Sequence, residues 1–215
     1  MRALLLAVLL LLAACAGTPA PDWQANAQAS LRAFSLAYFA GNTRLAAQEF
    51  ARARADIAST GRPDLLARAE LTRCAVRAAS LEFDDCAGYA TLAPDAGKEE
   101  RAYADFLAGR WAGLDASLLP AQQRALLAGY ADAETLARIA DPISRLVAAG
   151  VLFRLGRLAP AGIATAVETA SANGWRRPLL AWLGVEAARA DAAGNRDAAA
   201  RIRRRMELVT DTGLR

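Results

Sequence analysis

The chain has 215 residues, enough for one domain with a sizeable apolar core or for a short array of helical repeats. Alanine, leucine and arginine dominate the sequence and the strand-forming residues valine, isoleucine and threonine are sparse, so the composition predicts an all-α fold. The formal net charge of +4 is too small to indicate nucleic-acid binding, and the absence of histidine excludes the commonest general base and ordinary Ser-His-Asp triads.

The first residues have the pattern of a secretory signal. Met1 and Arg2 provide a short positive start, and residues 3–12 are apolar without a single polar side chain. This apolar segment is shorter than the roughly 20 residues that a membrane-spanning helix needs. We therefore expect residues 1–14 to be a signal peptide and not a permanent membrane span.

The next residues carry a lipidation motif. Leu12-Ala13-Ala14-Cys15 resembles the lipobox of bacterial lipoproteins, and the resemblance implies cleavage before Cys15 and a covalent lipid on its sulfur, with no other cofactor. Two or more acyl chains make such anchoring stable. Ala16 follows the cysteine, which in enterobacterial-type sorting implies the periplasmic face of the outer membrane. The alternative is ordinary cleavage at a small-residue site, which would release a soluble periplasmic protein.

The other two cysteines, Cys74 and Cys86, remain as a pair once Cys15 carries lipid. In the oxidising periplasm they are expected to form a structural disulfide that closes a loop of about 13 residues. The alternative is two buried free thiols on apolar helix faces. A redox-active or metal site is not expected, because there is no CxxC motif and no histidine to complete a ligand set.

The first helices follow a short linker, residues 15–22, in which two prolines discourage regular structure. Asp22 is expected to cap a helix whose apolar stripe recurs at helical spacing: Trp23, Ala27, Leu31, Phe34 and Tyr38. Thr43 is expected to cap a second helix that runs through Ser59. A third helix is predicted over residues 64–81, then an irregular or short helical stretch over 83–94, then a helix over about 98–111.

The second half continues with helices separated by glycine or proline. A helix is predicted over residues 120–130, and Asp132 and then Asp141-Pro142 are expected to start the next two, with proline in its favoured first position. Gly156 ends the latter, and the last helices are predicted over 160–172, 178–193 and 196–209. This makes about ten helices in a single domain, residues 23–215.

The first hairpin resembles a tetratricopeptide repeat over roughly residues 27–60. Gly41, Ala46, Phe50 and Ala53 stand at that family's turn glycine, small, aromatic and small positions. The resemblance implies an α-solenoid of stacked antiparallel hairpins with a groove that binds a peptide or partner protein. The groove positions that it carries over to this chain are Gln28, Leu31, Ser35 and Tyr38, of which Leu31 and Tyr38 also lie on the apolar stripe and are core residues in most folds.

Surface arginines offer a second possible function, contact with an anionic envelope polymer or lipid. The candidates are Arg176 and Arg177 in a turn and Arg201, Arg204 and Arg205 on the last helix. The alternative is that these arginines offset helix dipoles and face solvent.

An enzyme is not expected. The candidate acid pairs, Asp84 with Asp85 and Glu99 with Glu100, are adjacent in sequence, and adjacent helical side chains point in different directions. The sequence has no phosphate-binding loop and no nucleophile elbow. It therefore predicts a membrane-anchored adaptor that binds an envelope protein or peptide.

Overall fold

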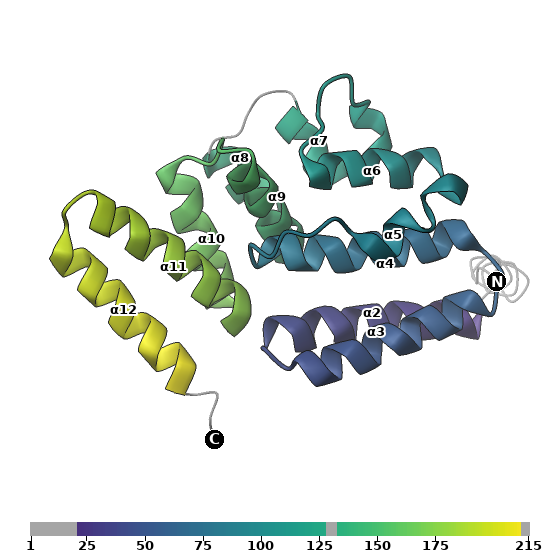
Figure 1. The fold of residues 1–215 in the computed structure, drawn as a ribbon, viewed down its shortest axis with the longest axis horizontal. Helices are drawn as coiled ribbons and strands as arrows, with labels where there is room; N and C mark the ends of the chain where they lie inside the picture. Colours follow the sequence, from purple (N-terminus) through teal and green to yellow (C-terminus); the bar gives the residue numbers. More distant parts are fainter. Residues whose placement is uncertain (1–20, 128–132, 212–215) are drawn as a thin grey trace, which may run out of the picture.

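The computed structural model describes residues 21–127 and 133–211. This part of the chain forms eleven α-helices and two short 3-10 helices and contains no strand, which confirms the all-α prediction (Figure 1). None of these helices is long and apolar enough to cross a membrane. In chain order the elements are α2 (Asp22–Phe39), α3 (Thr43–Ala58), α4 (Pro63–Ala79), α5 (Ala87–Ala90), η1 (Ala93–Asp95), α6 (Lys98–Ala108), η2 (Ala116–Leu118), α7 (Ala121–Leu127), α8 (Ala133–Arg138), α9 (Pro142–Arg154), α10 (Pro160–Ala172), α11 (Arg176–Ala192) and α12 (Arg196–Asp211).

Two predicted helix caps are wrong by one residue. The side-chain oxygen of Asn42 accepts a hydrogen bond from the backbone N–H of Leu45 at 3.1 Å, so Asn42 caps α3 and Thr43 is its first helical residue. At the start of α2, Pro21 takes the cap position and Asp22 lies in the first turn, where a negative charge is favoured by the helix dipole.

The starts of α9 and α10 agree with the sequence pattern, whereas α11 begins at Arg176 instead of Pro178 and α6 ends at Ala108 instead of near Trp111. Asp141 caps α9 by accepting a hydrogen bond from the N–H of Ser144 at 2.7 Å, and Pro142 occupies the first helical position. Helix α10 has the predicted bounds, Pro160–Ala172. The expected helix start at Asp132, the signal peptide and the lipobox lie outside the described residues.

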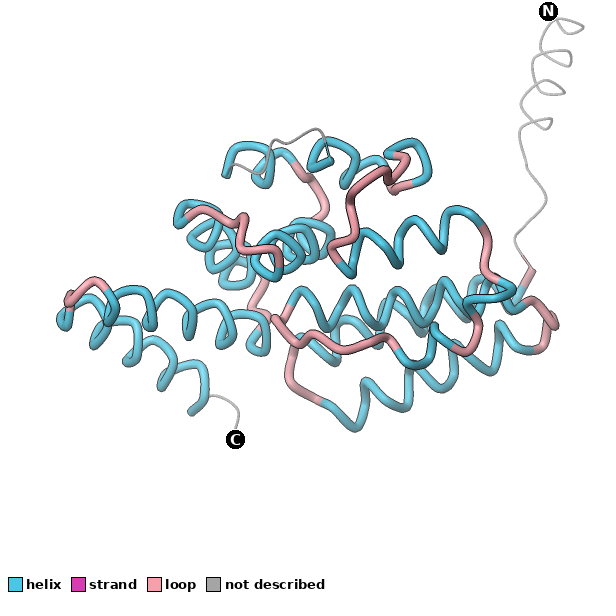
Figure 2. The backbone as a smooth tube through the Cα atoms, turned by 45° about the horizontal axis from the view of Figure 1, so that its top comes forward, coloured by secondary structure: helices cyan, strands magenta, loops and turns pink. Residues whose placement is uncertain are grey.

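Three glycine turns produce antiparallel hairpins. Gly41, Gly156 and Gly194 have φ values of 85°, 65° and 70°, a left-handed conformation that costs glycine little because it has no Cβ. They join α2 to α3, α9 to α10 and α11 to α12. The last hairpin lies at one end of the molecule in both ribbon and tube views (Figures 1 and 2).

Helix α4 lies at the centre of the packing. Its largest contact is with α9, and it also packs against α2, α3, α5 and α6. Gly150 permits the close approach of α9, because a Cβ at this position would overlap the carbonyl oxygen of Ala78. Trp182 of α11 is fully buried and donates its indole N–H to the carbonyl oxygen of Ala79 at 3.1 Å.

The α4–α9 pairing departs from a regular solenoid. In a solenoid each repeat contacts only its neighbours along the chain, whereas α4 and α9 are separated by residues 80–141. The described residues therefore form a set of helical hairpins around α4, and a continuous tetratricopeptide-like solenoid is not confirmed.

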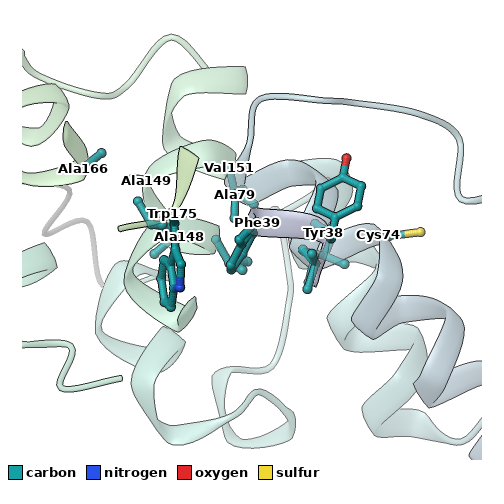
Figure 3. Packing of buried hydrophobic residues seen from close by; sticks show 14 of the residues in the cluster. Tyr38, Phe39, Cys74, Ala79, Ala148, Ala149, Val151, Ala166 and Trp175 are labelled. Atoms are coloured by element: carbon teal, nitrogen blue, oxygen red, sulfur yellow. The ribbon is translucent and has the colours of Figure 1, made fainter. Parts of the chain in front are cut away.

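Aromatic side chains join the first hairpin to the C-terminal helices. The rings of Phe39 and Trp175 have centroids 4.8 Å apart, and both side chains are buried (Figure 3). Within the first hairpin, the rings of Phe34 and Phe50 are 5.1 Å apart. Ala46 and Ala53 are buried beside them, so the small and aromatic positions of the predicted repeat do pack α2 against α3.

Candidate functional site

A pocket of about 400 Å³ opens on the surface beside the two cysteines. Helices α4 and α6 and the short helix α5 form its walls, together with the segment that follows α4. Its apolar part includes Leu71, Ala78, Ala104 and Leu107, and its charged part Glu82, Asp84, Asp85, Arg110 and Arg154.

A disulfide between Cys74 and Cys86 forms one side of the pocket, and it confirms the pairing predicted from the sequence. It ties the start of α5 to the buried face of α4 across 12 positions of the chain. Leu81 and Cys86 both have positive φ, 60° and 47°, which is unfavourable for residues with a side chain. The disulfide therefore holds a segment whose backbone is strained at both ends.

Most charges at the pocket are already paired. Glu82 lies 3.1 Å from the guanidinium of Arg177 and 3.8 Å from that of Arg77, which also contacts Asp84 at 3.1 Å. Arg110 binds Asp105 at 2.7 Å.

Two charges at the pocket remain without an ion pair among the described residues: Asp85 and Arg154. The guanidinium of Arg154 lies 5.5 Å from the centre of the Phe83 ring and makes one long hydrogen bond, 3.5 Å, to the carbonyl oxygen of Leu107. Phe83 is 37% exposed, which is unusual for a large aromatic side chain. The pocket thus presents one negative charge, one positive charge and an aromatic ring to solvent.

Metal binding by the cysteines depends on their oxidation state. The ligand atoms of Cys74, Asp84 and Cys86 lie within 4.8 Å of one another, close enough for one ion. A metal requires thiolates, whereas here the two sulfurs are bonded to each other. The carboxylate of Asp84 is also engaged, because it accepts the backbone N–H of Cys86 at 3.1 Å and pairs with Arg77.

The candidate acid pairs of the sequence are engaged by arginines. Asp84 is paired with Arg77, while Asp85 is exposed. Glu100 is buried and accepts two hydrogen bonds from Arg68 at 2.9 and 2.6 Å, and the exposed Glu99 accepts one from the same guanidinium at 3.3 Å. Both carboxylates of the second pair are therefore bound to one arginine.

The partner-binding residues predicted on the first hairpin do not form an open surface. Gln28 is exposed, but Ser35 and Tyr38 are only 5% and 7% exposed. The hydroxyl of Ser35 donates to the carbonyl oxygen of Leu31 at 3.0 Å within α2. The prediction of a groove through Ser35 and Tyr38 is therefore wrong, because both side chains face the interior of the bundle.

Tyr38 is covered by Arg177, whose guanidinium lies 4.2 Å from the centre of its ring. The same guanidinium donates to the carbonyl oxygen of Tyr38 at 2.9 Å and to the hydroxyl of Thr43 at 2.7 Å. Burial, and then the neighbouring Glu82 carboxylate, raise the pKa of the Tyr38 hydroxyl above its ordinary value of 10.0. This cluster joins α11 to the turn between α2 and α3.

The five arginines predicted to contact anions therefore divide into two groups. Arg176 and Arg177 are half-buried, and Arg177 is committed to the first hairpin. Arg201, Arg204 and Arg205 are exposed on α12. Arg176 and Arg177 do not lie in a turn as predicted, because they are the first two residues of α11. They are not part of an open basic surface, and only the arginines of α12 remain candidates for a ligand.

A second buried polar cluster lies under α5, and no sequence motif predicts it. Glu70 is fully buried on α4 and forms ion pairs with Arg54 and, at 2.7 Å, with Arg73. A Cβ on Gly88 would overlap the Glu70 carboxylate, so the glycine lets α5 close over this pair. Glu70 therefore supports α5, which forms one wall of the pocket.

Sequence reasoning missed the pocket itself. The available signal was Phe83 between acidic residues, in a stretch expected to be irregular and followed closely by Cys86. Comparisons with protein-family models, with curated proteins and with solved structures found no match to this chain. The site must therefore be interpreted from its own chemistry.

Proposed function

We propose that this chain is a membrane-anchored helical adaptor of the bacterial cell envelope that binds a partner protein through the pocket beside Cys74 and Cys86. Its lipid is carried by Cys15 and its domain lies on the periplasmic side of the outer membrane. The observation that carries the binding proposal is the pocket of about 400 Å³ with an apolar floor, an exposed Phe83 and the unpaired charges of Asp85 and Arg154.

The compartment is supported by two independent features. The first 15 residues have the pattern of a signal peptide and lipobox. The disulfide between Cys74 and Cys86 belongs to an oxidising compartment, since cytosolic proteins rarely keep structural disulfides.

Binding of a protein is supported by the mixed character of the pocket. In protein–protein interfaces, most of the binding free energy comes from a few aromatic or arginine side chains that lie in a desolvated pocket surrounded by polar groups. The guanidinium of Arg154 lies over the ring of the exposed Phe83, and the apolar side chains of Leu71 and Ala104 line the same pocket. A partner side chain with an apolar body and a polar end fits this arrangement.

The anchor and the partner are tested together by crosslinking in intact cells. The wild-type protein is purified after crosslinking, its partners are identified by mass spectrometry, and a Cys15→Ser chain serves as the unlipidated control. We expect one envelope protein to be enriched only with wild type. Identical membrane partitioning of the two chains would overturn the lipid anchor.

The pocket is tested by filling it from α5. Ala90 lines the pocket and Ala87 does not, although both are exposed on the same short helix. We expect Ala90→Trp to abolish recovery of the partner and Ala87→Trp to leave it unchanged, with equal melting temperatures. Undiminished recovery with Ala90→Trp would show that the partner binds elsewhere.

A further inference from the structure

Helix α12 presents a basic face with an exposed leucine. Arg201 lies three and four residues before Arg204 and Arg205, and these lie four and three residues before Leu208, so all four residues share one side of the helix. All four are exposed, and Leu208 is the most exposed large apolar residue of the described chain, at 68%. We call these four residues the arginine–leucine face.

The opposite side of α12 packs against the protein. Ala199 is fully buried, and Ile202 and Met206 pack against the apolar core while α12 lies along α11. Figures 1 and 2 show α12 as the outermost helix, with no other described helix beyond it. The arginine–leucine face is therefore an outer surface of the described fold.

The three arginines of this face are not engaged in ion pairs among the described residues. The neighbouring Arg203 is different, because it is paired with Asp191 of α11. The face therefore offers guanidinium groups whose paired N–H donors suit phosphate oxygens.

We propose that the arginine–leucine face binds the anionic headgroups of a phospholipid membrane. The arginines contact lipid phosphates, and the Leu208 side chain enters the boundary between headgroups and acyl chains. Leu208 favours a lipid surface over a soluble polyanion, because a polyanion would pair with the charges but would gain nothing from an apolar side chain beside them.

The position of α12 determines how the molecule would lie on the membrane. The start of α2 and helix α12 lie at opposite ends of the long axis of the molecule (Figure 1). If the proposed anchor on Cys15 also holds, two attachment points keep that axis along the membrane. Only this orientation rests on the anchor, and the lipid-binding face itself does not.

The test uses a chain that begins at Ala16, so that neither the apolar leader nor a lipid contributes to binding. The buried core begins at Ala27, and this chain keeps all of it. Circular dichroism verifies that each variant is folded. Binding is measured by cosedimentation with vesicles of phosphatidylcholine alone and with vesicles that also contain phosphatidylglycerol.

We expect binding only to the phosphatidylglycerol vesicles, weakening as salt is added. Replacing Arg201, Arg204 and Arg205 with glutamine is expected to lower the partition coefficient about a hundredfold. The matched control, Arg32→Gln with Arg44→Gln and Arg189→Gln, removes the same charge from exposed positions of α2, α3 and α11 and is expected to bind like wild type. Leu208→Ser is expected to bind several-fold more weakly.

Two results would overturn the proposal. The first is equal loss of vesicle binding in both triple variants, or no binding by wild type. The second is binding of soluble polyphosphate that competes fully with vesicles and is unaffected by Leu208→Ser, since this would identify a polyanion site. Because the chain lacks the anchor and the pocket is unchanged, either result leaves the adaptor proposal standing.

Discussion

The guanidinium of Arg177 lies 4.2 Å from the centre of the Tyr38 ring, although the two residues are 139 positions apart in the chain. With its hydrogen bonds to the Tyr38 carbonyl oxygen and Thr43 and its ion pair with Glu82, Arg177 links α11 to the first hairpin and to the segment after α4. The buried ring pair of Phe39 and Trp175 lies beside this link.

Replacing Arg177 with alanine is expected to lower the free energy of unfolding by about 2–3 kcal/mol, because three acceptors lose a charged donor in a half-buried site. Urea denaturation followed by circular dichroism measures this change. Arg189→Ala, an exposed arginine of the same helix, is the control and is expected to change stability by less than about 0.5 kcal/mol. Equal effects of the two substitutions would show that the link contributes nothing specific.

The helix contact at Gly150 predicts opposite results for two glycine-to-alanine changes. At Gly150 a Cβ would overlap the backbone of Ala78, so α4 and α9 would have to separate at a cost of about 2–3 kcal/mol. At Gly184, within α11, no atom lies within 4 Å of the added Cβ, and alanine is expected to stabilise the protein by about 0.5–1 kcal/mol. Thermal melts of both variants check the pair, and a stabilised Gly150→Ala would contradict the close approach.

Removing the disulfide is expected to lower the free energy of unfolding by about 3 kcal/mol, as the loop-closure relation gives for about 13 residues. The variant with Cys74→Ala and Cys86→Ala is compared with wild type by urea denaturation, with and without a reducing agent. The reductant should destabilise wild type to the level of the variant and leave the variant unchanged. If the reducing agent also destabilised the variant without the two cysteines, its effect on wild type could not be attributed to the disulfide.

Stability is expected to fall at alkaline pH in part through Tyr38. Its pKa is raised in the folded protein, so the unfolded chain loses this proton first. The contribution of Tyr38 to the free energy of unfolding is complete below its ordinary pKa of 10.0. It is lost as the pH rises through the pKa that Tyr38 has in the folded protein. Urea midpoints at about pH 8 and about pH 10.5 should differ less for Tyr38→Phe than for wild type. The same difference in both would remove Tyr38 as a cause.

The stability of the Tyr38→Phe variant is still expected to fall somewhat at alkaline pH, because of Tyr103. Burial, and then the charge of Asp141, raise the pKa of Tyr103 as well. The double variant with Tyr103→Phe should therefore show the smallest change of the series.

Sequence reasoning recovered the features that are encoded locally. The bounds of α10 follow from Pro160 at its start and from Asn173-Gly174 at its end, and Asp141 with Pro142 identifies the start of α9. The cap of α3 was misplaced because Asn42 and Thr43 are both good capping residues, and only the backbone conformation chooses between them.

The pairing of helices could not be read in the same way. The apolar stripe that includes Phe34 and Tyr38 shows that one face of α2 is buried, but periodicity does not say against which helix. The repeat resemblance therefore predicts a groove at Tyr38, whereas in the structure Arg177 of α11 covers the Tyr38 ring. The pocket was missed for the same reason, since the chain segments that form it come together only when α4, α5 and α6 pack.

The pairing of α4 with α9 has a consequence for folding. Helix α4 ends at Ala79 and α9 begins at Pro142, so a connection of 62 residues must close before the two helices meet. Until it closes, the backbone of Ala78 and the apolar side of α4 have no partner from the second half of the chain. The first three helices are therefore not a finished folding unit, and the chain depends on its later half to complete its centre.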